Sequence, residues 1–260
     1  MNKPEISCIV PAYENLNLLS RCLMSILTQK NIENEVIVCD DSKSNDVRDF
    51  VELLASKYSN VQYLNGSRSG NPVDNWNKGL EQSKADYCVV IHHDEFLVDN
   101  KYLRDAVDRV EENNLDAVVA CSAVVGITRK SRFSIMRRLI CFLGNPLWML
   151  FFVNWVGSTA NVVFRKRIDL KFDASLKYLV DVDFYYRIFI RKLSYEFLNR
   201  IVVISVAHHS AQITASYDFL TENIKEIKYM RRLKNFSILS WQYNILLLLA
   251  NIRKTLGYRR

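Results

Sequence analysis

Residues 86–96 read Asp-Tyr-Cys-Val-Val-Ile-His-His-Asp-Glu-Phe. Five mostly apolar residues with strong strand preference, 87–91, run without a charge into the polar residues 92–95. The pattern predicts a buried strand that ends in a cluster able to bind a metal. In open α/β sheets, ligands bind beyond the carboxyl ends of the strands, so a charged ligand or a cation is expected here. The alternative is a strand-end turn with solvated acids.

Strand and helix patterns alternate on both sides of this stretch. Asn17 is expected to cap the first helix, and Pro72 suits the first turn of the third. The expected strands lie at 6–10, 36–39, 61–64, 87–91 and 116–125, and the expected helices at 18–26, 46–58, 72–83 and 102–113. This alternation predicts an α/β fold, in which helices cover both faces of a mostly parallel sheet.

Polar residues follow three of these strands, at 11–14, 40–42 and 92–95, and are expected at one edge of the sheet. Carboxylates there can accept hydrogen bonds from a nucleotide base and ribose, whereas a phosphate-bearing ligand needs a divalent cation to offset the charge. No Gly-x-Gly-x-x-Gly follows the first strand, and no Gly-x-x-x-x-Gly-Lys occurs. These absences argue against dinucleotide dehydrogenases and P-loop enzymes.

The formal net charge of +7 is unevenly distributed. Residues 1–116 carry −8 and residues 169–226 carry −1, whereas 117–168 and 227–260 each carry +8 without a single acid. Such blocks favour a polyanionic partner, and the long apolar runs inside them favour an anionic membrane surface over nucleic acid. No nucleic-acid-binding motif is present.

Two apolar segments belong to these basic blocks. Residues 139–156 hold no charge, but Gly144 and Pro146 interrupt them, which favours an interfacial or acceptor-facing helix pair over a membrane span. A buried helix is the alternative. A second helix is expected to lie in a membrane interface or, alternatively, to pack on the domain. Its apolar stripe is Ile238, Trp241, Ile245, Leu249 and Ile252.

The six cysteines read as reduced core thiols of a cytosolic protein.

Several short motifs occur in a specific order. They are Pro-Ala-Tyr at 11–13, Glu-Val-Ile-Val-Cys-Asp-Asp-Ser at 35–42, Asn-Trp-Asn at 75–77, the stretch 87–95, Phe-Asp at 172–173, Val-Asp-Val-Asp-Phe-Tyr-Tyr-Arg at 180–187 and His-His-Ser-Ala-Gln-Ile-Thr at 208–214. This order resembles the family 2 glycosyltransferases with the GT-A fold, over about residues 4–215. The resemblance implies a GT-A domain at 1–215, with a nucleotide-binding half (1–125) and an acceptor-binding half (126–215). Basic amphipathic helices would follow at 216–260.

The resemblance assigns a nucleotide site to the first half. Asp40 looks like the acid that reads the nucleotide base, and Asn75 lies in a donor-side motif. The segment of Pro11, Ala12 and Tyr13 would help to hold the nucleotide. Glu14, where the family often has Asn, belongs to the same expected site.

The resemblance also implies a divalent cation, Mn²⁺ or Mg²⁺. Asp94 looks like the last acid of the family's Asp-x-Asp motif, which binds the metal on the donor diphosphate. His92 stands where the first Asp of that motif is common, and His93 where a ribose-binding acid is often found. These are departures that affect donor preference and metal affinity. His209 matches a family histidine that would complete the metal or diphosphate site, or else is satisfied by a neighbouring carbonyl.

Asp181 matches the catalytic base of the family, in a motif usually written Glu-Asp, here with Val180 in place of Glu. Asp183 faces Arg187 at i,i+4 in the favourable orientation, which predicts a structural ion pair. Asp181 has no such partner in its helix and is the better candidate to accept a proton. A plain acid at a helix N-terminus is the alternative.

The expected protein is thus an inverting hexosyltransferase that moves a sugar from a nucleotide-sugar to a hydroxyl of a lipid-linked surface glycan. It would be a bacterial protein located at the inner face of the cell membrane. Two alternatives stay open. A nucleotidyltransferase would need a Gly-rich basic loop after the first strand, and a non-catalytic membrane-associated protein of the same fold would account for His92 and His93.

Overall fold

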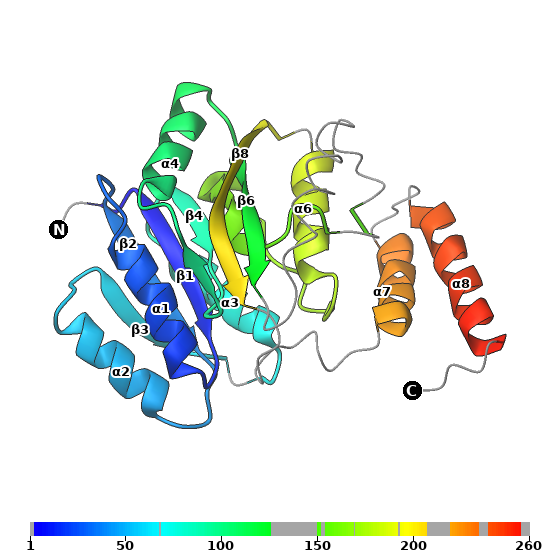
Figure 1. Ribbon diagram of the computed structural model, residues 1–260, viewed down its shortest axis with the longest axis horizontal. Coiled ribbons are helices and arrows are strands. Elements are labelled where there is room, and N and C mark those ends of the chain that lie inside the picture. The colour runs from blue at the N-terminus through cyan, green and yellow to red at the C-terminus, as the bar shows by residue number, and fades with distance from the viewer. Residues whose placement is uncertain are drawn as a thin grey trace.

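The computed structural model describes residues 3–67, 69–125, 150–151, 154–168, 170–191, 193–206, 219–233 and 239–255. Eight strands in this part of the chain form one sheet, in the order β3-β2-β1-β4-β7-β6-β8-β5 (Figure 1). They are β1 Ile6–Ala12, β2 Asn34–Asp40, β3 Val61–Asn65, β4 Tyr87–Val90, β5 Glu95–Leu97, β6 Ala117–Val125, β7 Val162–Arg165 and β8 Tyr195–Val206.

Helices connect and cover these strands. The α-helices are α1 Leu16–Leu27, α2 Asp46–Ala55, α3 Pro72–Gln82, α4 Tyr102–Glu112, α6 Val180–Ile190, α7 Phe219–Leu233 and α8 Leu239–Thr255, and the 3-10 helices are η2 Thr159–Asn161 and η3 Lys166–Ile168. β3, β2, β1 and β4 are mutually parallel, and β6 is parallel to β8. β7 and β5 run antiparallel to their neighbours. The predicted α/β fold with a mostly parallel sheet is confirmed.

Buried side chains form two apolar cores, one on each face of the sheet. Because side chains alternate along a strand, Cys8 and Val10 of β1 face one core while Ile9 faces the other. The first core is completed by α1, α2 and α4, and the second by α3, α6 and α7. The helices therefore cover both faces, and the ends of the strands are left as the places where polar groups gather.

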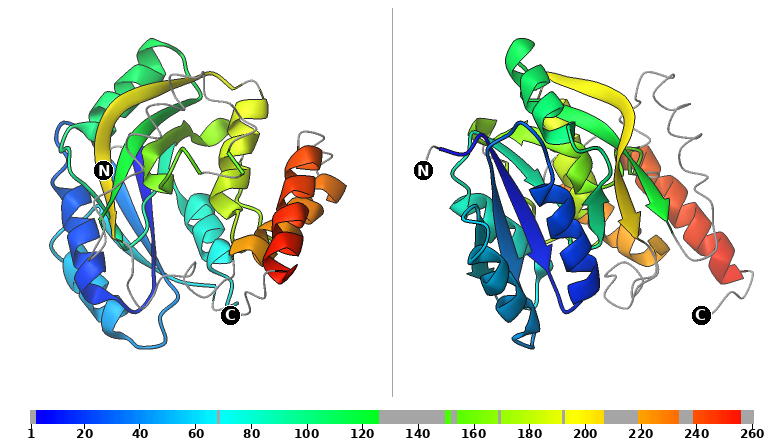
Figure 2. Two further views of the ribbon diagram at one scale, coloured as in Figure 1. Left: turned by 45° about the vertical axis from the view of Figure 1, so that its right-hand side comes forward. Right: turned by 60° about the vertical axis from the view of Figure 1, so that its left-hand side comes forward.

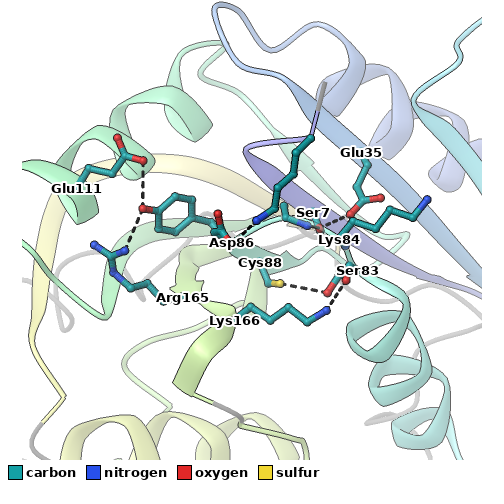
Figure 3. Close-up of polar contacts among 12 residues, drawn as sticks. Ser7, Glu35, Ser83, Lys84, Asp86, Cys88, Glu111, Arg165 and Lys166 are labelled. Carbon is teal, nitrogen blue, oxygen red and sulfur yellow. Dashed lines mark hydrogen bonds and ion pairs between the residues drawn. The ribbon is translucent and has the colours of Figure 1, made fainter. Parts of the chain in front are cut away.

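A polar network closes the amino ends of the central strands (Figure 3). Ser7 Oγ donates to the buried Glu35 carboxylate at 2.5 Å. Arg165 Nη1 donates to the Tyr87 hydroxyl at 3.1 Å, and that hydroxyl donates to Glu111 Oε1 at 3.1 Å. Since these groups satisfy one another at this edge, the opposite, carboxyl edge is the one available to a ligand.

The first helix begins differently from the expectation. Its cap is Asn15 and not Asn17, because Asn15 has non-helical backbone angles and its Oδ1 accepts from Leu18 N at 3.2 Å. Strand β1 also continues past Pro11 to Ala12. This proline lies beyond the last residue of β1 that pairs with β4, Ile9, so its missing N–H removes no bond from that ladder.

One strand of the sheet was not expected, and one expected segment lies mostly outside the described residues. β5 has only three residues and was not predicted, and it pairs with β8. Of the apolar segment 139–156, most residues lie outside the described part of the chain. The residues described there include Leu150, Phe151 and Trp155, all buried in the core.

The C-terminal helices α7 and α8 pack against each other beside α6 (Figures 1 and 2). Arg231 of α7 lies over the ring of Tyr243 of α8, with 4.8 Å from its Cζ to the ring centroid. In α8, Leu246 is buried, but an apolar face is exposed, formed by Ile245, Leu248, Leu249 and Ile252. Within the described residues, none of the helices is both long and apolar enough to span a bilayer.

Candidate active site

A cleft of about 280 Å³ opens at the carboxyl edge of the sheet. Its floor is the turn after β4, one wall comes from α3, and the other from η2, the loop before α6 and the first turn of α6. The lining residues are Pro72, Val73, Trp76, His92, His93, Asp94, Glu95, Ser158, Thr159, Lys177, Tyr178, Val180, Asp181 and Ser205. The cleft thus brings together four predicted site residues from two distant segments.

The three predicted polar strand ends are neighbours. Asp41 N donates to Ala12 O at 3.1 Å, and His93 N donates to Pro11 O at 3.3 Å. Ala12 pairs in register with Asp40. The ends of β1, β2 and β4 therefore form one continuous edge, as the sequence predicts, although residues 11–14, Asp40 and Asn75 do not line the 280 Å³ cleft itself.

Asp40 is held firmly at this edge. The residue is only 3% exposed, and its Oδ1 accepts from Ser42 N at 2.9 Å while its Oδ2 accepts from the Tyr63 hydroxyl at 3.0 Å. Each carboxylate oxygen has a second lone pair that can accept from a ligand. Gly66 allows the loop after β3 to cross here, since a Cβ at Gly66 would lie 2.4 Å from Asp40 O.

Glu14 and Asn75 organise the surroundings of Asp40. Glu14, with φ of 59°, donates its N–H to Ser42 Oγ at 2.7 Å and accepts from Lys43 N at 2.8 Å. Asn75 is buried and donates to Cys39 O at 2.6 Å. These contacts tie the loop after β1 and helix α3 to the end of β2.

The turn after β4 holds two groups with shifted pKa values. Burial lowers the pKa of His92 to about 4, so the ring is neutral at pH 7, and it packs edge-on against Trp76 at 4.5 Å between centroids. Burial and then the charge of Asp94 raise the pKa of Glu95 to about 8. Glu95 Oε2 accepts from His92 N at 3.0 Å, which fixes the turn. Glu95 belongs to the polar cluster predicted at 92–95, although the sequence predicted no individual role for it.

Of the two predicted ligands for the cation that the family resemblance implies, Asp94 lines the cleft. In the described part of the chain, no group of three or more His, Cys, Asp or Glu side chains could hold a metal, and His209 lies outside that part. Mg²⁺ is often bound by one or two carboxylates together with substrate phosphates. The donor set fits a cation shared with a diphosphate and does not fit a closed protein cage.

Asp181 lies in the first turn of α6, on the wall of the cleft opposite α3. Its Oδ2 accepts from Asn154 Nδ2 at 2.6 Å, and its Oδ1 accepts from Val182 N at 2.8 Å. Burial raises the pKa of Asp181 to about 6, while these hydrogen bonds oppose the shift. A carboxylate with such a pKa is suited to accept a proton near neutral pH.

Asp183 has the different partner that its spacing predicts. Arg187 Nε donates to Asp183 Oδ2 at 2.8 Å, and Arg187 Nη2 donates to Lys171 O at 2.7 Å. Unlike Asp181, Asp183 is fully buried and does not line the cleft.

Asn154 was not predicted as a site residue, although it interrupts the apolar run at 139–156. Its Oδ1 accepts from Gly157 N at 2.9 Å and its Nδ2 donates to Gly157 O at 3.1 Å. Gly157 has φ of 85°, and a Cβ there would lie 2.7 Å from Ser122 Oγ. Asn154 therefore joins a glycine turn to the carboxylate of Asp181.

Curated relatives match parts of the chain. An uncharacterised protein of Mycobacterium tuberculosis is 29% identical over 204 residues, 73% of this chain and 63% of that protein. The GalNAc(5)-diNAcBac-PP-undecaprenol beta-1,3-glucosyltransferase of Campylobacter jejuni is 31% identical over 36% of this chain. The poly(ribitol-phosphate) beta-N-acetylglucosaminyltransferase TarP of Staphylococcus aureus is 30% identical over 47%. The chain spans only 31% and 38% of these two enzymes.

Solved structures share the fold. A TarS fragment from S. aureus, in complex with UDP-GlcNAc, superposes with a TM-score of 0.63 at 19% identity, over 86% of this chain and 66% of that one. The mannosyltransferase PcManGT from Pyrobaculum calidifontis, in complex with GDP-Man and Mn²⁺, gives 0.64 at 15% identity, over 89% and 65%. These likenesses confirm the GT-A fold. The model of "Glycosyl transferase family 2" matches residues 7–173, and the chain belongs to this family of glycosyltransferases.

Proposed function

We propose that the protein is an inverting hexosyltransferase that transfers a sugar from a nucleotide-sugar to a hydroxyl of a surface glycan. The observation that carries this proposal is the presence of Asp94 and Asp181 in one 280 Å³ cleft. One carboxylate is suited to a donor diphosphate with its cation, and the other to an acceptor hydroxyl. The relatives named above act on undecaprenol-linked and poly(ribitol-phosphate) acceptors, which supports a cell-surface glycan.

In the proposed reaction, Asp181 takes the proton of the acceptor hydroxyl while that oxygen attacks the anomeric carbon. The new C–O bond forms on the face opposite the breaking bond to the diphosphate, so the configuration inverts. A divalent cation bound with Asp94 would offset the charge of the leaving diphosphate. Asp40 accepts from the nucleotide base, and Asn75 holds the end of β2 beside it. His92, whose pKa burial lowers to about 4, faces the donor without adding charge, and His93 lies beside it.

An acceptor on a lipid diphosphate is proposed from the surface of the C-terminal helices. α8 exposes Leu248 at 59% and Leu249 at 47%. Residues 227–260 carry eight basic and no acidic side chains. A helix with an apolar face and flanking cations binds the interface of an anionic membrane. We therefore place the enzyme in the cytoplasm, at the inner face of the cell membrane.

A panel of nucleotide-sugars tests the proposed function. The melting temperature is measured with each donor, with and without Mn²⁺ or Mg²⁺, because a ligand that binds only the native state stabilises it. We expect metal-dependent stabilisation by one donor class, followed by transfer to lipid-linked glycan extracts. Stabilisation without any transfer would instead indicate a non-catalytic binding protein. Stabilisation by nucleoside triphosphates alone would indicate a nucleotidyltransferase.

The membrane proposal predicts salt-sensitive binding to lipid. The protein should sediment with vesicles rich in phosphatidylglycerol at low salt and be released as salt rises, because ions screen the attraction. Replacing the exposed cations Lys228 and Arg232 by Gln should weaken this salt-sensitive binding. Leu248→Gln should instead weaken the vesicle binding that persists at high salt. Equal binding to phosphatidylcholine vesicles, or none to acidic ones, contradicts an electrostatic contribution.

A further inference from the structure

Helix α6, which carries Asp181, has no cap of its own. Its N-cap residue is Leu179, whose side chain can accept no hydrogen bond. The first amide groups of a helix lack partners inside the helix, and leaving them unpaired in a buried place is unfavourable. The start of α6 packs into the core, since Leu179 and Val180 are buried, so these amides need an acceptor from elsewhere.

Glu226 of α7 supplies an acceptor for the N-cap amide of Leu179 and for the two amides that precede it. Its Oε1 accepts from Lys177 N at 2.6 Å and its Oε2 from Leu179 N at 2.7 Å. Tyr178 N lies between the two oxygens, at 3.1 and 3.2 Å. Three consecutive amides thus converge on one carboxylate that is only 4% exposed. Both oxygens accept, which fits the ionised form, and a negative charge at a helix N-terminus also interacts favourably with the helix dipole.

The segment held in this way belongs to the cleft. Lys177 and Tyr178 line it directly, and Asp181 follows two residues after Leu179. A second contact joins α7 to the loop before α6, since the Tyr229 hydroxyl of α7 donates to Asp173 Oδ2 of that loop at 3.3 Å. The position of Asp181 relative to the floor of the cleft therefore depends on α7.

We propose that Glu226 is a positioning residue of the active site, which sets the place of Asp181 by capping α6 from the C-terminal helix α7. The role of Asp181 rests on the proposed function, whereas the cap itself does not. Glu226 also acts on Asp181 through charge, since its carboxylate raises the pKa of Asp181. Among the described residues, the other ionisable groups that line the cleft with Asp181 are His92, His93, Asp94, Glu95, Lys177 and Tyr178.

The test compares Glu226→Gln with two matched variants. Glu226→Asp keeps the charge on a shorter side chain. Glu222→Gln removes the same charge one turn earlier on α7, where Glu222 pairs with Lys225 at 3.6 Å. For each variant, three properties are measured: hydrogen exchange of the amides at 177–179, the titration of Asp181 by carboxyl ¹³C NMR, and transfer with the donor found in the panel above.

In Glu226→Gln we expect faster exchange at 177–179, a lower pKa of Asp181, and a kcat reduced about ten- to hundredfold with unchanged nucleotide affinity. The acid limb of the pH–rate profile should move to lower pH, which a loss of stability alone would not cause. Glu226→Asp should keep the acid limb in place and recover part of the rate, and Glu222→Gln should behave as wild type.

Wild-type exchange and Asp181 titration in Glu226→Gln would overturn the proposal. If Glu226→Gln does not fold, Glu226→Asp is the deciding variant. Wild-type amide exchange and wild-type transfer in Glu226→Asp would show that the site does not depend on the position of this carboxylate, which would also overturn the proposal. Changed exchange and titration in a protein that transfers no sugar would instead support the cap while refuting the proposed function.

Discussion

Asp181→Asn is expected to lower transfer by about two to four orders of magnitude, the usual contribution of a positioned general base. The amide keeps the size of the carboxylate and can accept from Asn154 Nδ2, now at 2.6 Å, but cannot take a proton. Donor and metal binding should therefore survive. The measurements are kcat with the cognate donor and acceptor at saturating metal, and the affinity for the nucleoside diphosphate.

The pH dependence of the wild type follows from the same carboxylate. Asp181 must be deprotonated to act as the base, and burial raises its pKa to about 6. The rate should therefore be constant above this pH and fall about tenfold for each unit below it. Asp181→Asn should lose this acid limb along with the rate.

Asp183→Asn is the matched control, two residues along the same helix. Asp183 is fully buried and bonded to Arg187, so its replacement breaks a buried ion pair. Breaking a buried pair costs about 3 kcal/mol, so the melting temperature should fall while transfer by the folded protein persists. If Asp183→Asn lost transfer with its fold intact, and Asp181→Asn did not, the base would be Asp183.

The second large effect is expected at the nucleotide edge. Asp40→Ala should weaken binding of a nucleoside diphosphate about ten- to hundredfold, with or without metal, because it removes a charged acceptor. Asp94→Ala should remove only the metal-dependent share of the affinity. Calorimetric titrations with UDP and GDP, with and without Mn²⁺, separate the two effects.

Because Asp40 also accepts from Ser42 and Tyr63, its removal could disturb the edge itself. Asp40→Asn is the gentler variant, and the melting temperature of each protein without ligand is the control. The metal dependence of Asp94→Ala is the decisive comparison. If it equalled that of the wild type, the cation would be held by other residues.

Local patterns in the sequence predict some features and miss others for a physical reason. The run at 87–91 and the Asp183–Arg187 spacing depend on neighbours in the chain, so both could be read directly. Asn154 reaches Asp181 across 27 residues, and Glu226 reaches Leu179 across 47. Pairs so far apart leave no periodic signal in a single sequence. The short β5 was missed because it exists only by pairing with β8.

The family match at 7–173 covers the nucleotide edge but ends before the helix that carries Asp181. The roles of Asp40, Asp94, Asp181 and His209 and the division of the chain at 215 remain predictions. Asp40, Asp94 and Asp181 were all predicted from motifs that resemble the family, whereas Asn154 and Glu226 were not, because they contact the segment of Asp181 from distant parts of the chain.

The cap of α6 also sets an order of events during synthesis. Leu179 is synthesised 47 residues before Glu226. The amides at 177–179 therefore have no carboxylate acceptor until α7 has been synthesised. The sheet strands from β1 to β8 all precede that point. A nascent chain can therefore assemble the whole sheet and its nucleotide edge while the first turn of α6 is still uncapped. Activity should emerge only once α7 has left the ribosome, after all eight strands of the sheet have been made.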